Sequence, residues 1–413
     1  MNNEANKTSW QLPTTIWNPM FFSIFFANMV MNLSQQMSNS QLSLYAKSLG
    51  APADQIGSLM SMFAITALIF RFISGPSMNS FNRKKLLAMA MGLMTTAYLG
   101  FSFSPKIAAI IGCETILVLK IFRLIQGVGN AFGNACCLTI VSDVLPKDKF
   151  TTGMGYYACA QVVSQAIGPT IGVFLSDTFG YEMTYIIVGC CMIIAILLTT
   201  TVVRLAPREP LPFNLNIGNM IAKEALVPAG ITFFVAMGFT TINSFMLVYA
   251  SERGITGGSL FFTVYALSML VTRPMVGKLT DKYGFVRVGI PAVLMTALSL
   301  ILIGQSTNLA MLLFAAFINS CGYGAVQPAL QSLCMKSVPA SRRGSASSTN
   351  FIGMDSATII GPNISGAIAA KLGYVPMMWV AMAVPCVIGA TFIFLMRKVI
   401  YKIEDDFQAR TSN

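Results

Sequence analysis

Runs of about 20 apolar residues recur about twelve times along this chain, and they limit its fold more than any other feature. A helix of about 20 residues crosses the roughly 30 Å hydrocarbon core of a bilayer and satisfies its own backbone hydrogen bonds there. Hydrophobic residues make up 55% of the chain and charged residues 10%, against about 25% charged residues in soluble domains. The sequence therefore predicts an all-α membrane protein with twelve transmembrane helices, at residues 19–46, 54–76, 85–104, 115–141, 150–175, 183–203, 226–250, 257–277, 287–305, 309–333, 346–370 and 376–397.

The net charge of +12 raises the question of a nucleic-acid partner, and the positions of the cations answer it. With both termini placed in the cytoplasm, nineteen Lys and Arg residues fall in cytoplasmic segments, and four, Lys47, Lys106, Arg253 and Lys371, fall outside. Cytoplasmic loops of membrane proteins carry such an excess of Lys and Arg. We therefore expect a multi-pass protein of the cell membrane, in contact with lipid, with both termini cytoplasmic and no nucleic-acid partner.

One stretch of the chain resembles a linker. Residues 204–225 contain Pro207, Pro210 and Pro212 and mixed charges between the sixth and seventh apolar runs. The expected organisation is a cytoplasmic N-terminal tail at 1–18, six-helix bundles at 19–203 and 226–397 on either side of the linker, and a cytoplasmic C-terminal tail at 398–413.

The two halves repeat one another. The charged loop from Gly277 to Arg287 has a degenerate copy 202 residues earlier that begins at Gly75, and Asn79 stands there in place of Asp281. Arg71 and Arg273 each precede the first glycine of their loop by four residues. Repeats of this kind at half the chain length are typical of transporters built from two related units. The sequence predicts two bundles related by a pseudo-two-fold axis.

The fourth span carries polar side chains at spacings of three and four, which place them on one helix face. Because an Arg or Lys near the bilayer centre costs at least about 2.5 kcal/mol, this face points to a wet cavity or to a partner helix. The alternatives of solute binding and interhelical hydrogen bonding both stay open. The residues are Lys120, Arg123, Gln126, Asn130 and Asn134.

The first span carries a stripe of amides and no carboxylate. Amides offer both donors and acceptors to a bound solute, and they can equally bridge to neighbouring helices. Asn243 in the seventh span stands at the position equivalent to Asn39. We predict that a substrate cavity is lined by residues of the first, fourth and seventh spans. They are Asn28, Asn32, Gln35, Gln36 and Asn39 of the first span, Lys120, Gln126, Asn130 and Asn134 of the fourth, and Asn243 of the seventh.

Asp355 is the one acid deep in any expected span. It lies about ten residues, or roughly 15 Å, from the end of its helix, close to the bilayer midplane. An unpaired carboxyl at that depth favours the neutral form, which suits reversible protonation. A fixed ion pair with a cation such as Arg123, or a capping role at a local helix break, are the other possibilities.

Three motifs together resemble the major facilitator superfamily, over residues 19–397. The first is the loop Gly277-x-x-x-Asp281-Lys282-x-Gly284-x-x-Arg287. In that family the acid of this loop pairs with basic groups and helix ends to hold the cytoplasmic side closed. The resemblance therefore implies a cytoplasmic gate that also includes the preceding arginines and the first-half copy, Arg71, Gly75, Asn79 and Arg273. Asn79 departs from the pattern, because it stands where the motif has the acid. A gate in the first half therefore cannot use a carboxylate at this position.

The other two motifs concern coupling. Arg123-x-x-Gln126-Gly127-x-Gly129 resembles the fourth-helix motif, whose arginine is linked in the family to proton coupling. Gly168-Pro169-x-x-Gly172 resembles the fifth-helix motif of proton-driven drug-efflux antiporters, which implies a bacterial source. Its glycine-proline pair recurs at Gly361-Pro362, and we predict that both sites bend during transport. The first span lacks the acid often found there in drug antiporters, so Asp355 becomes the expected proton carrier.

These features predict a secondary transporter that exports a small organic molecule by proton antiport, through rocking of two halves around a central site. Uptake or exchange of an organic anion is the alternative, because Lys120 and Arg123 outnumber Asp355. The chain has no histidine and its nine cysteines form no C-x-x-C motif, so we expect no enzyme activity, no cofactor and no metal site. Nothing in the sequence resembles the selectivity filter of a channel.

Overall fold

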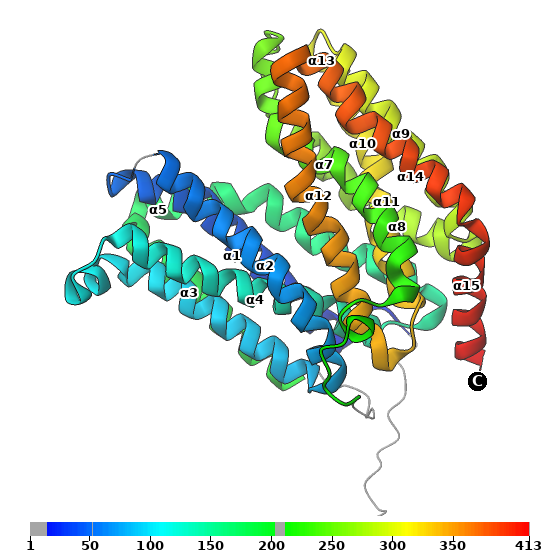
Figure 1. Cartoon of the computed structure of the whole chain (residues 1–413), viewed down its shortest axis with the longest axis horizontal. Coiled ribbons are helices and arrows are strands. Elements are labelled where there is room, and N and C mark those ends of the chain that lie inside the picture. Colours follow the sequence, from blue (N-terminus) through cyan, green and yellow to red (C-terminus); the bar gives the residue numbers. More distant parts are fainter. Residues whose placement is uncertain (1–14, 52, 203–210, 413) are drawn as a thin grey trace, which may run out of the picture.

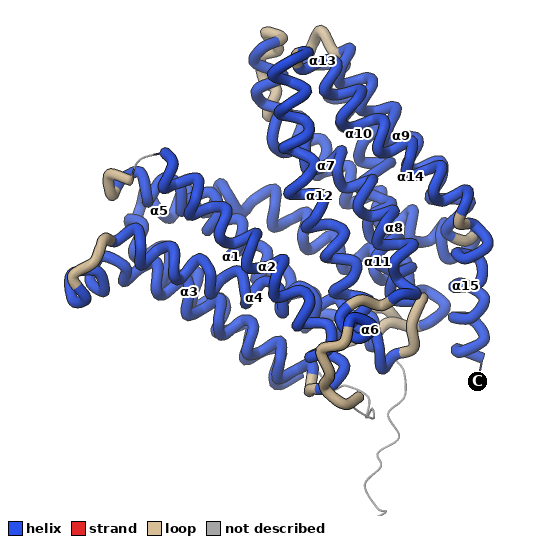
Figure 2. Tube along the Cα trace, in the orientation of Figure 1, coloured by secondary structure: helices blue, strands red, loops and turns tan. Residues whose placement is uncertain are grey.

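The computed structural model describes residues 15–51, 53–202 and 211–412, and these residues form helices and no strands (Figure 2). The first 14 residues of the expected N-terminal tail, and residues 204–210 of the expected linker, lie outside the described residues.

The first half forms five long helices. They are α1 (Pro19–Ser48), α2 (Ala53–Ser80), α3 (Arg83–Ile111), α4 (Thr115–Val144) and α5 (Phe150–Val202), with a 3₁₀ turn, η1 (Lys147–Lys149), before α5. α5 contains the fifth and sixth expected spans. They are separated at Gly180, whose φ of 78° and ψ of 166° are not helical and suit a residue without a Cβ.

The second half follows two short linker elements, α6 (Ile217–Met220) and η2 (Lys223–Ala225). Its first spans are α7 (Leu226–Glu252), α8 (Leu260–Tyr283) and α9 (Phe285–Gln305). The tenth span is α10 (Leu309–Asn319), a π-helical turn η3 (Ser320–Gly324) and α11 (Ala325–Lys336). After η4 (Ala340–Arg342), the eleventh span is α12 (Arg343–Leu372). The twelfth span consists of three consecutive elements: α13 (Tyr374–Pro376), a second π-helical segment η5 (Met377–Ala383) and α14 (Val384–Leu395).

Nine helical stretches of the described residues are long and apolar enough to cross a membrane. α5 is one of them although it holds two spans, and α1 and α12 are not among them. α1 and α12 both carry amides and hydroxyls along their length, and α12 also carries Asp355. These polar side chains lower the hydropathy of the two helices. Counting both spans of α5 and adding α1 and α12 gives the twelve expected spans.

The two halves form two bundles that meet at one end and diverge at the other (Figure 1). At the meeting end, called the closed end below, α2 packs against α12 and α5 packs against α8. This is the end at which α2 finishes at Ser80 and α12 begins at Arg343. The opposite end is called the open end.

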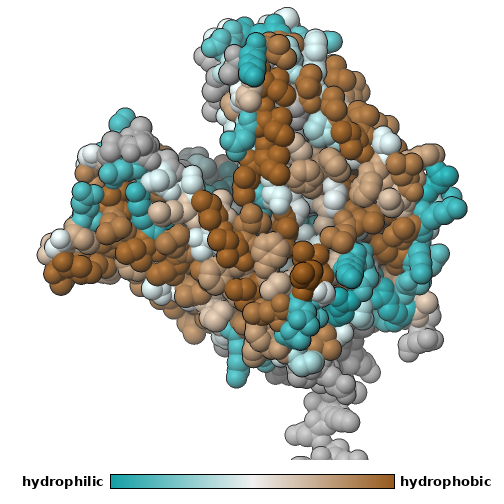
Figure 3. All heavy atoms as spheres, viewed as in Figure 1, coloured by the Kyte–Doolittle hydropathy of each residue, from teal (hydrophilic) through white to brown (hydrophobic). Residues whose placement is uncertain are grey.

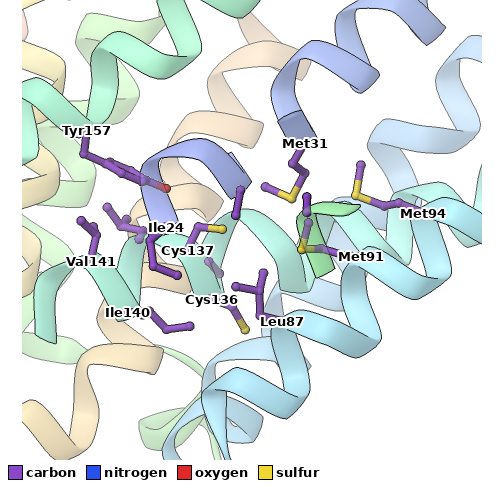
Figure 4. Close-up of a cluster of buried hydrophobic side chains, with 14 of the residues drawn as sticks. Ile24, Met31, Leu87, Met91, Met94, Cys136, Cys137, Ile140, Val141 and Tyr157 are labelled. Atoms are coloured by element: carbon purple, nitrogen blue, oxygen red, sulfur yellow. The ribbon is translucent and has the colours of Figure 1, made fainter. Parts of the chain in front are cut away.

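Each bundle has its own apolar core. Figure 4 shows part of the first core, where Met31 of α1, Met91 of α3 and Cys136 and Cys137 of α4 lie together. This cluster continues into the second half at the closed end, through residues that include Met335, Ala346 and Phe407. Burial of apolar surface therefore stabilises the junction of the bundles as well as each bundle.

Two equivalent glycines allow the helices to touch at the junction. A Cβ on Gly75 of α2 would lie 3.1 Å from Ser345 Cα of α12. A Cβ on Gly277 of α8 would lie 2.8 Å from the Thr151 carbonyl oxygen and from Thr152 Cα of α5. The absence of a side chain at both positions permits the close approach of backbones.

The C-terminal residues form a further helix, α15 (Arg397–Ser412), where the sequence analysis placed a tail. Its apolar residues Ile400, Ile403 and Phe407 are buried. They recur at spacings of three and four, so they form one face that packs against the closed end. The Phe407 ring lies 5.4 Å from the Phe150 ring at the start of α5, which places α15 in contact with both halves.

Candidate functional site

A pocket of about 390 Å³, including its open mouth, lies between the two bundles. α1, α4 and α5 line it from the first half, and α11 and α12 from the second half. Its polar lining consists of six amides and one phenol, and none of its lining residues is charged. The lining residues are Asn28, Asn32, Asn134, Leu138, Tyr157, Ala158, Gln161, Gln327, Gln331, Phe351 and Met354.

The amides of the pocket differ in how far the protein satisfies them. Asn32 Nδ2 donates to the Asn28 carbonyl and side-chain oxygens at 2.7 and 2.9 Å, and Asn134 donates to Asn130 Oδ1 at 2.9 Å. Gln161 and Gln331 make no side-chain hydrogen bond with the residues that the structure describes. These two glutamines can therefore offer donors and acceptors to a ligand or to water.

Three of the predicted cavity residues, Asn28, Asn32 and Asn134, line this pocket, and their role in binding remains a prediction. Sequence reasoning missed Gln161, Gln327 and Gln331. The last two are four residues apart in the tenth span and share a helix face, so the same spacing argument could have found them. The pocket lining does not include the other predicted residues, Gln35, Gln36, Asn39, Lys120, Gln126, Asn130 and Asn243.

Arg123 is 2% exposed and is held within the first bundle. Its guanidinium donates to Gln126 Oε1 at 2.5 Å and to Asn39 Oδ1 at 2.8 Å, and it lies 4.6 Å over the Phe63 ring. Gln126 is fully buried and donates in turn to the Tyr98 hydroxyl at 3.3 Å. Asn39 of α1 and Tyr98 of α3 thus connect two other helices to this pair of α4 residues, and no carboxylate of the described residues takes part in the network.

Asp355 forms an ion pair with a cation, one of the alternatives expected for it, but the partner is Arg71 and not Arg123. Arg71 Nε and Asp355 Oδ2 are 2.9 Å apart, and their side chains are 1% and 26% exposed. Arg71 also donates to the Ala131 carbonyl at 2.7 Å and lies 4.3 Å over the Phe351 ring. Ala131 lies two helical turns, about 12 Å, along α4 from Arg123. Arg123 thus lies at another depth of the bundle.

Arg273 is the second-half equivalent of Arg71 and also joins the two halves. Its guanidinium donates to the Ala158 carbonyl of α5, to the Gly324 carbonyl at 3.0 Å and to Gln327 Oε1 at 3.3 Å. Both arginines therefore contact the opposite bundle, but only Arg71 does so through a carboxylate. The junction is asymmetric in its charged groups.

Asp281 closes the junction at the start of α5. Its carboxylate accepts from the Thr151 and Thr152 backbone amides at 3.0 and 2.7 Å and from the Thr152 hydroxyl at 2.8 Å, and it lies 3.6 Å from Lys336 Nζ. The first amides of a helix have no partner within the helix, and the helix dipole favours a negative charge there. A second-half carboxylate thus binds a first-half helix end.

Asn79 lies at the equivalent place at the start of α12. Its Nδ2 donates to Ser345 Oγ at 2.6 Å, while its Oδ1 is buried without a hydrogen-bond partner among the residues that the structure describes. Asn79 therefore contacts the opposite bundle without supplying a charge to the helix end.

Asp143 supplies a closing contact that sequence reasoning missed. It pairs with Arg83 of its own half and, at 2.9 Å, with Arg343 of the other half. The Arg83 guanidinium also donates to the Ala340 carbonyl at 2.8 Å. The sequence did offer one signal for this contact, since Asp143 is an acid at the end of the fourth span in a chain with few acids.

Three predicted gate residues do not reach the junction. Lys282 is exposed and lies over the ring of its neighbour Tyr283. Gly284 ends α8 and approaches Glu404 of α15, while Arg287 lines a separate pocket on the outside of the second bundle. The predicted loop thus contributes Gly277 and Asp281 to the junction, and its later residues contact other parts of their own half.

The predicted flexing sites are points of close packing in continuous helices. A Cβ on Gly168 would lie 2.7 Å from Gln36 Cβ, and one on Gly172 would lie 3.3 Å from Met37 Cα. A Cβ on Gly361 would lie 2.9 Å from Thr240 Oγ1. Bending remains a prediction for these segments, including their prolines, Pro169 and Pro362.

Comparisons with known proteins agree with this architecture. The model of the Major Facilitator Superfamily matches residues 24–226 and 229–410. The multi-drug resistance efflux pump PmrA of Streptococcus pneumoniae is 24% identical over 373 residues, which cover 87% of this chain and 91% of that protein. The staphylopine export protein of Staphylococcus aureus is 25% identical over 301 residues, 69% of each chain.

The solved structures show the same fold. A bacterial homologue of the iron transporter ferroportin in an outward-facing state has a TM-score of 0.79 at 13% identity, covering 92% of this chain and 99% of that one. The prediction of a twelve-helix fold is confirmed, as are the resemblance to this superfamily and the expectation of a protein that is not an enzyme. The chain belongs to the major facilitator superfamily and is a multi-pass membrane transporter.

Proposed function

We propose that this transporter exports a small organic molecule from the cell in exchange for protons, with the closed end and both termini in the cytoplasm. The observation that carries the proposal is the uncharged amide pocket at the junction of the two bundles, next to the ion pair of Arg71 and Asp355. A site lined by both halves is reached from one side at a time when the halves rock. Two relatives named for efflux and export support the direction of transport.

Asp355 is the proton carrier in this proposal. Its side chain is 26% exposed, so protons reach it while it holds Arg71. Protonation removes the negative charge and with it the Coulombic attraction that joins α2 to α12. Loss of this contact favours opening of the closed end, and release of the proton inside the cell restores the pair. The proton thereby biases a two-state equilibrium, as antiport requires.

The lining of the pocket favours this function over transport of an organic anion. Lys120 and Arg123, the cations that suggested the alternative, are not among the lining residues, and Arg123 is occupied by Gln126 and Asn39. A desolvated anion would find no opposite charge in the lining, which makes its binding costly. Amides and the aromatic faces of Tyr157 and Phe351 suit an uncharged polar or amphipathic compound.

The test is transport into inverted proteoliposomes under a pH gradient, against a panel of organic cations, organic anions and neutral amphiphiles. The Gln161→Leu variant removes an unpaired amide from the pocket and is expected to lower transport of the accepted compounds roughly tenfold, the loss of one or two ligand hydrogen bonds. Gln165→Leu changes the same side chain one turn along α5, outside the pocket lining. Absence of gradient-driven transport for every compound, or equal losses in both variants, would contradict the proposal.

A further inference from the structure

A second pocket lies on the outside of the second bundle, where α9, α14 and α15 meet. Its walls are apolar and include Ile290, Pro291 and Phe394. Its polar groups are two guanidinium groups, from Arg287 and Arg397, and the Tyr401 hydroxyl. The transport mechanism uses none of these residues.

The pocket lies at the depth at which two spans leave the apolar layer. The apolar span of α9 begins at Phe285, and that of α14 ends at Leu395. Arg287 therefore stands two residues inside the start of one span, and Arg397 stands two residues beyond the end of the other. In Figure 3 the brown surface of α9 and α14 gives way to teal where α15 begins. This is the level of lipid headgroups.

Both arginines lack an acidic partner within the described part of the chain. No carboxylate of that part lies within ion-pair distance of Arg287 or Arg397. The carboxylate of Glu404, nearby on α15, instead accepts from the Phe285 backbone amide at 2.8 Å. The guanidinium carbon of Arg397 lies 4.1 Å from the centroid of the Phe394 ring, a cation–π contact that favours one position of the guanidinium. One interfacial arginine is ordinary, but two that line one apolar pocket are suited to a shared anion.

We propose that this pocket binds the headgroup of an anionic phospholipid. The phosphate lies between Arg287 and Arg397, because guanidinium groups bind phosphate through paired hydrogen bonds. An acyl chain runs along Ile290 and Phe394 on the outer surface of the bundle. Basic pockets at the ends of membrane helices bind acidic headgroups by this chemistry. The site is independent of the transported molecule and of proton coupling.

The experiment measures lipid retention by native mass spectrometry. The full-length protein is reconstituted in phosphatidylcholine nanodiscs containing a minority of phosphatidylglycerol, and then released in detergent. The wild type is expected to retain phosphatidylglycerol, and the Arg287→Gln, Arg397→Gln double variant is expected to bind it roughly thirtyfold more weakly, from the attraction of two basic residues. The double variant with lysine at both positions keeps the charge but not the paired hydrogen bonds, and its affinity for the lipid is expected to lie between those of the wild type and the glutamine variant.

The matched control is the Lys85→Gln, Lys402→Gln double variant. It removes the same charge from exposed positions of α3 and α15 outside the pocket, and it is expected to retain the lipid like the wild type. A melting temperature shared by all variants in phosphatidylcholine alone shows that each is folded. Equal retention by the wild type and the Arg287→Gln, Arg397→Gln variant overturns the proposal. So does displacement of the lipid by an equal concentration of inorganic phosphate, which would identify the site as one for a soluble anion.

Discussion

Arg71 of α2 and Asp355 of α12 form an ion pair across the two bundles, 284 residues apart in sequence and 2.9 Å apart in space. The pair lies beside the central pocket, because Phe351 and Met354 of the same helix line it. It therefore connects the proposed proton carrier to a contact that joins the two halves.

We expect the two residues of this pair to be energetically coupled. Arg71→Met and Asp355→Asn should each lower the melting temperature, and the double variant should lose less than the sum of the two. Contacting charged residues show coupling of about 0.5 to 3 kcal/mol. Thermal unfolding of the four proteins measures it. Additive losses would mean that the pair does not stabilise this state.

Asp281 is expected to protect the start of α5. Asp281→Asn removes the charged acceptor of both the Thr151 and the Thr152 amide, and it leaves one neutral oxygen where two carboxylate oxygens accepted. Hydrogen–deuterium exchange of a peptide covering these residues should quicken roughly tenfold, since a charge-assisted hydrogen bond contributes about 1.5 to 3 kcal/mol. Asp148→Asn, a neighbouring acid on η1, is the control. Unchanged exchange in Asp281→Asn would count against this closing contact.

Restoring the missing acid in the first half should strengthen the junction. Asn79→Asp places a carboxylate at the start of α12, where the helix dipole contributes about 0.3 to 1 kcal/mol. Exchange of the Gly344 and Ser345 amides should slow, and transport should slow as well, because the closed end opens less often. Faster exchange there would show that the buried carboxylate is not tolerated.

Gly277 is expected to tolerate no side chain while the closed end is shut. The added carbons of Gly277→Val would meet the backbone of Thr151 and Thr152, with Cβ at 2.8 Å, and overpacking of this kind costs about 1 to 3 kcal/mol. Exchange at the start of α5 should therefore quicken. Gly92→Val in α3 is the control, since nothing lies within 4 Å of a Cβ there. Equal exchange in the two variants would refute the close approach.

α15 should dock less tightly as the pH rises. Burial raises the pKa of the Glu404 carboxyl above its ordinary value, although the Phe285 amide and Lys336 lower it, and Asp405 and Asp281 raise it further. A raised folded-state pKa stabilises docking at low pH, and this contribution is lost as the pH rises through the folded pKa. Melting temperatures between about pH 4 and 8 should show this loss. Glu404→Gln keeps the hydrogen-bond acceptor, and its curve should lack this component. Parallel curves for the two proteins would contradict it.

Local features of the sequence predicted the spans and the repeat. Hydrophobic runs report membrane helices directly, and the equivalence of Gly75 and Gly277 is visible in their loops. The partner of Asp355 could not be predicted, because Arg71 reaches it only through the packing of α2 on α12. Asp143 could not be assigned a partner from the sequence either, because only the packing of the two halves brings Arg343 beside it.

The pocket followed only in part from the sequence. The spacing of Asn28, Asn32 and Asn134 placed each on a polar helix face, but a polar face serves a cavity and a neighbouring helix equally well. Rotation of the helices decided between them, so Asn134 lines the pocket and Gln126 packs against Tyr98. The π-helical turn at Ser320–Gly324 depends on tertiary contacts and left no sequence signal that we could use.

The most direct test of proton antiport uses proteoliposomes with no imposed pH gradient and a trapped pH-sensitive dye. A gradient of a transported compound should drive protons in the opposite direction through the wild type. Asp355→Asn should bind the compound and move no protons, while Asp177→Asn, an exposed acid of α5, should behave like the wild type. Compound transport without a pH change in the wild type, or proton movement by Asp355→Asn at the wild-type rate, would contradict the account.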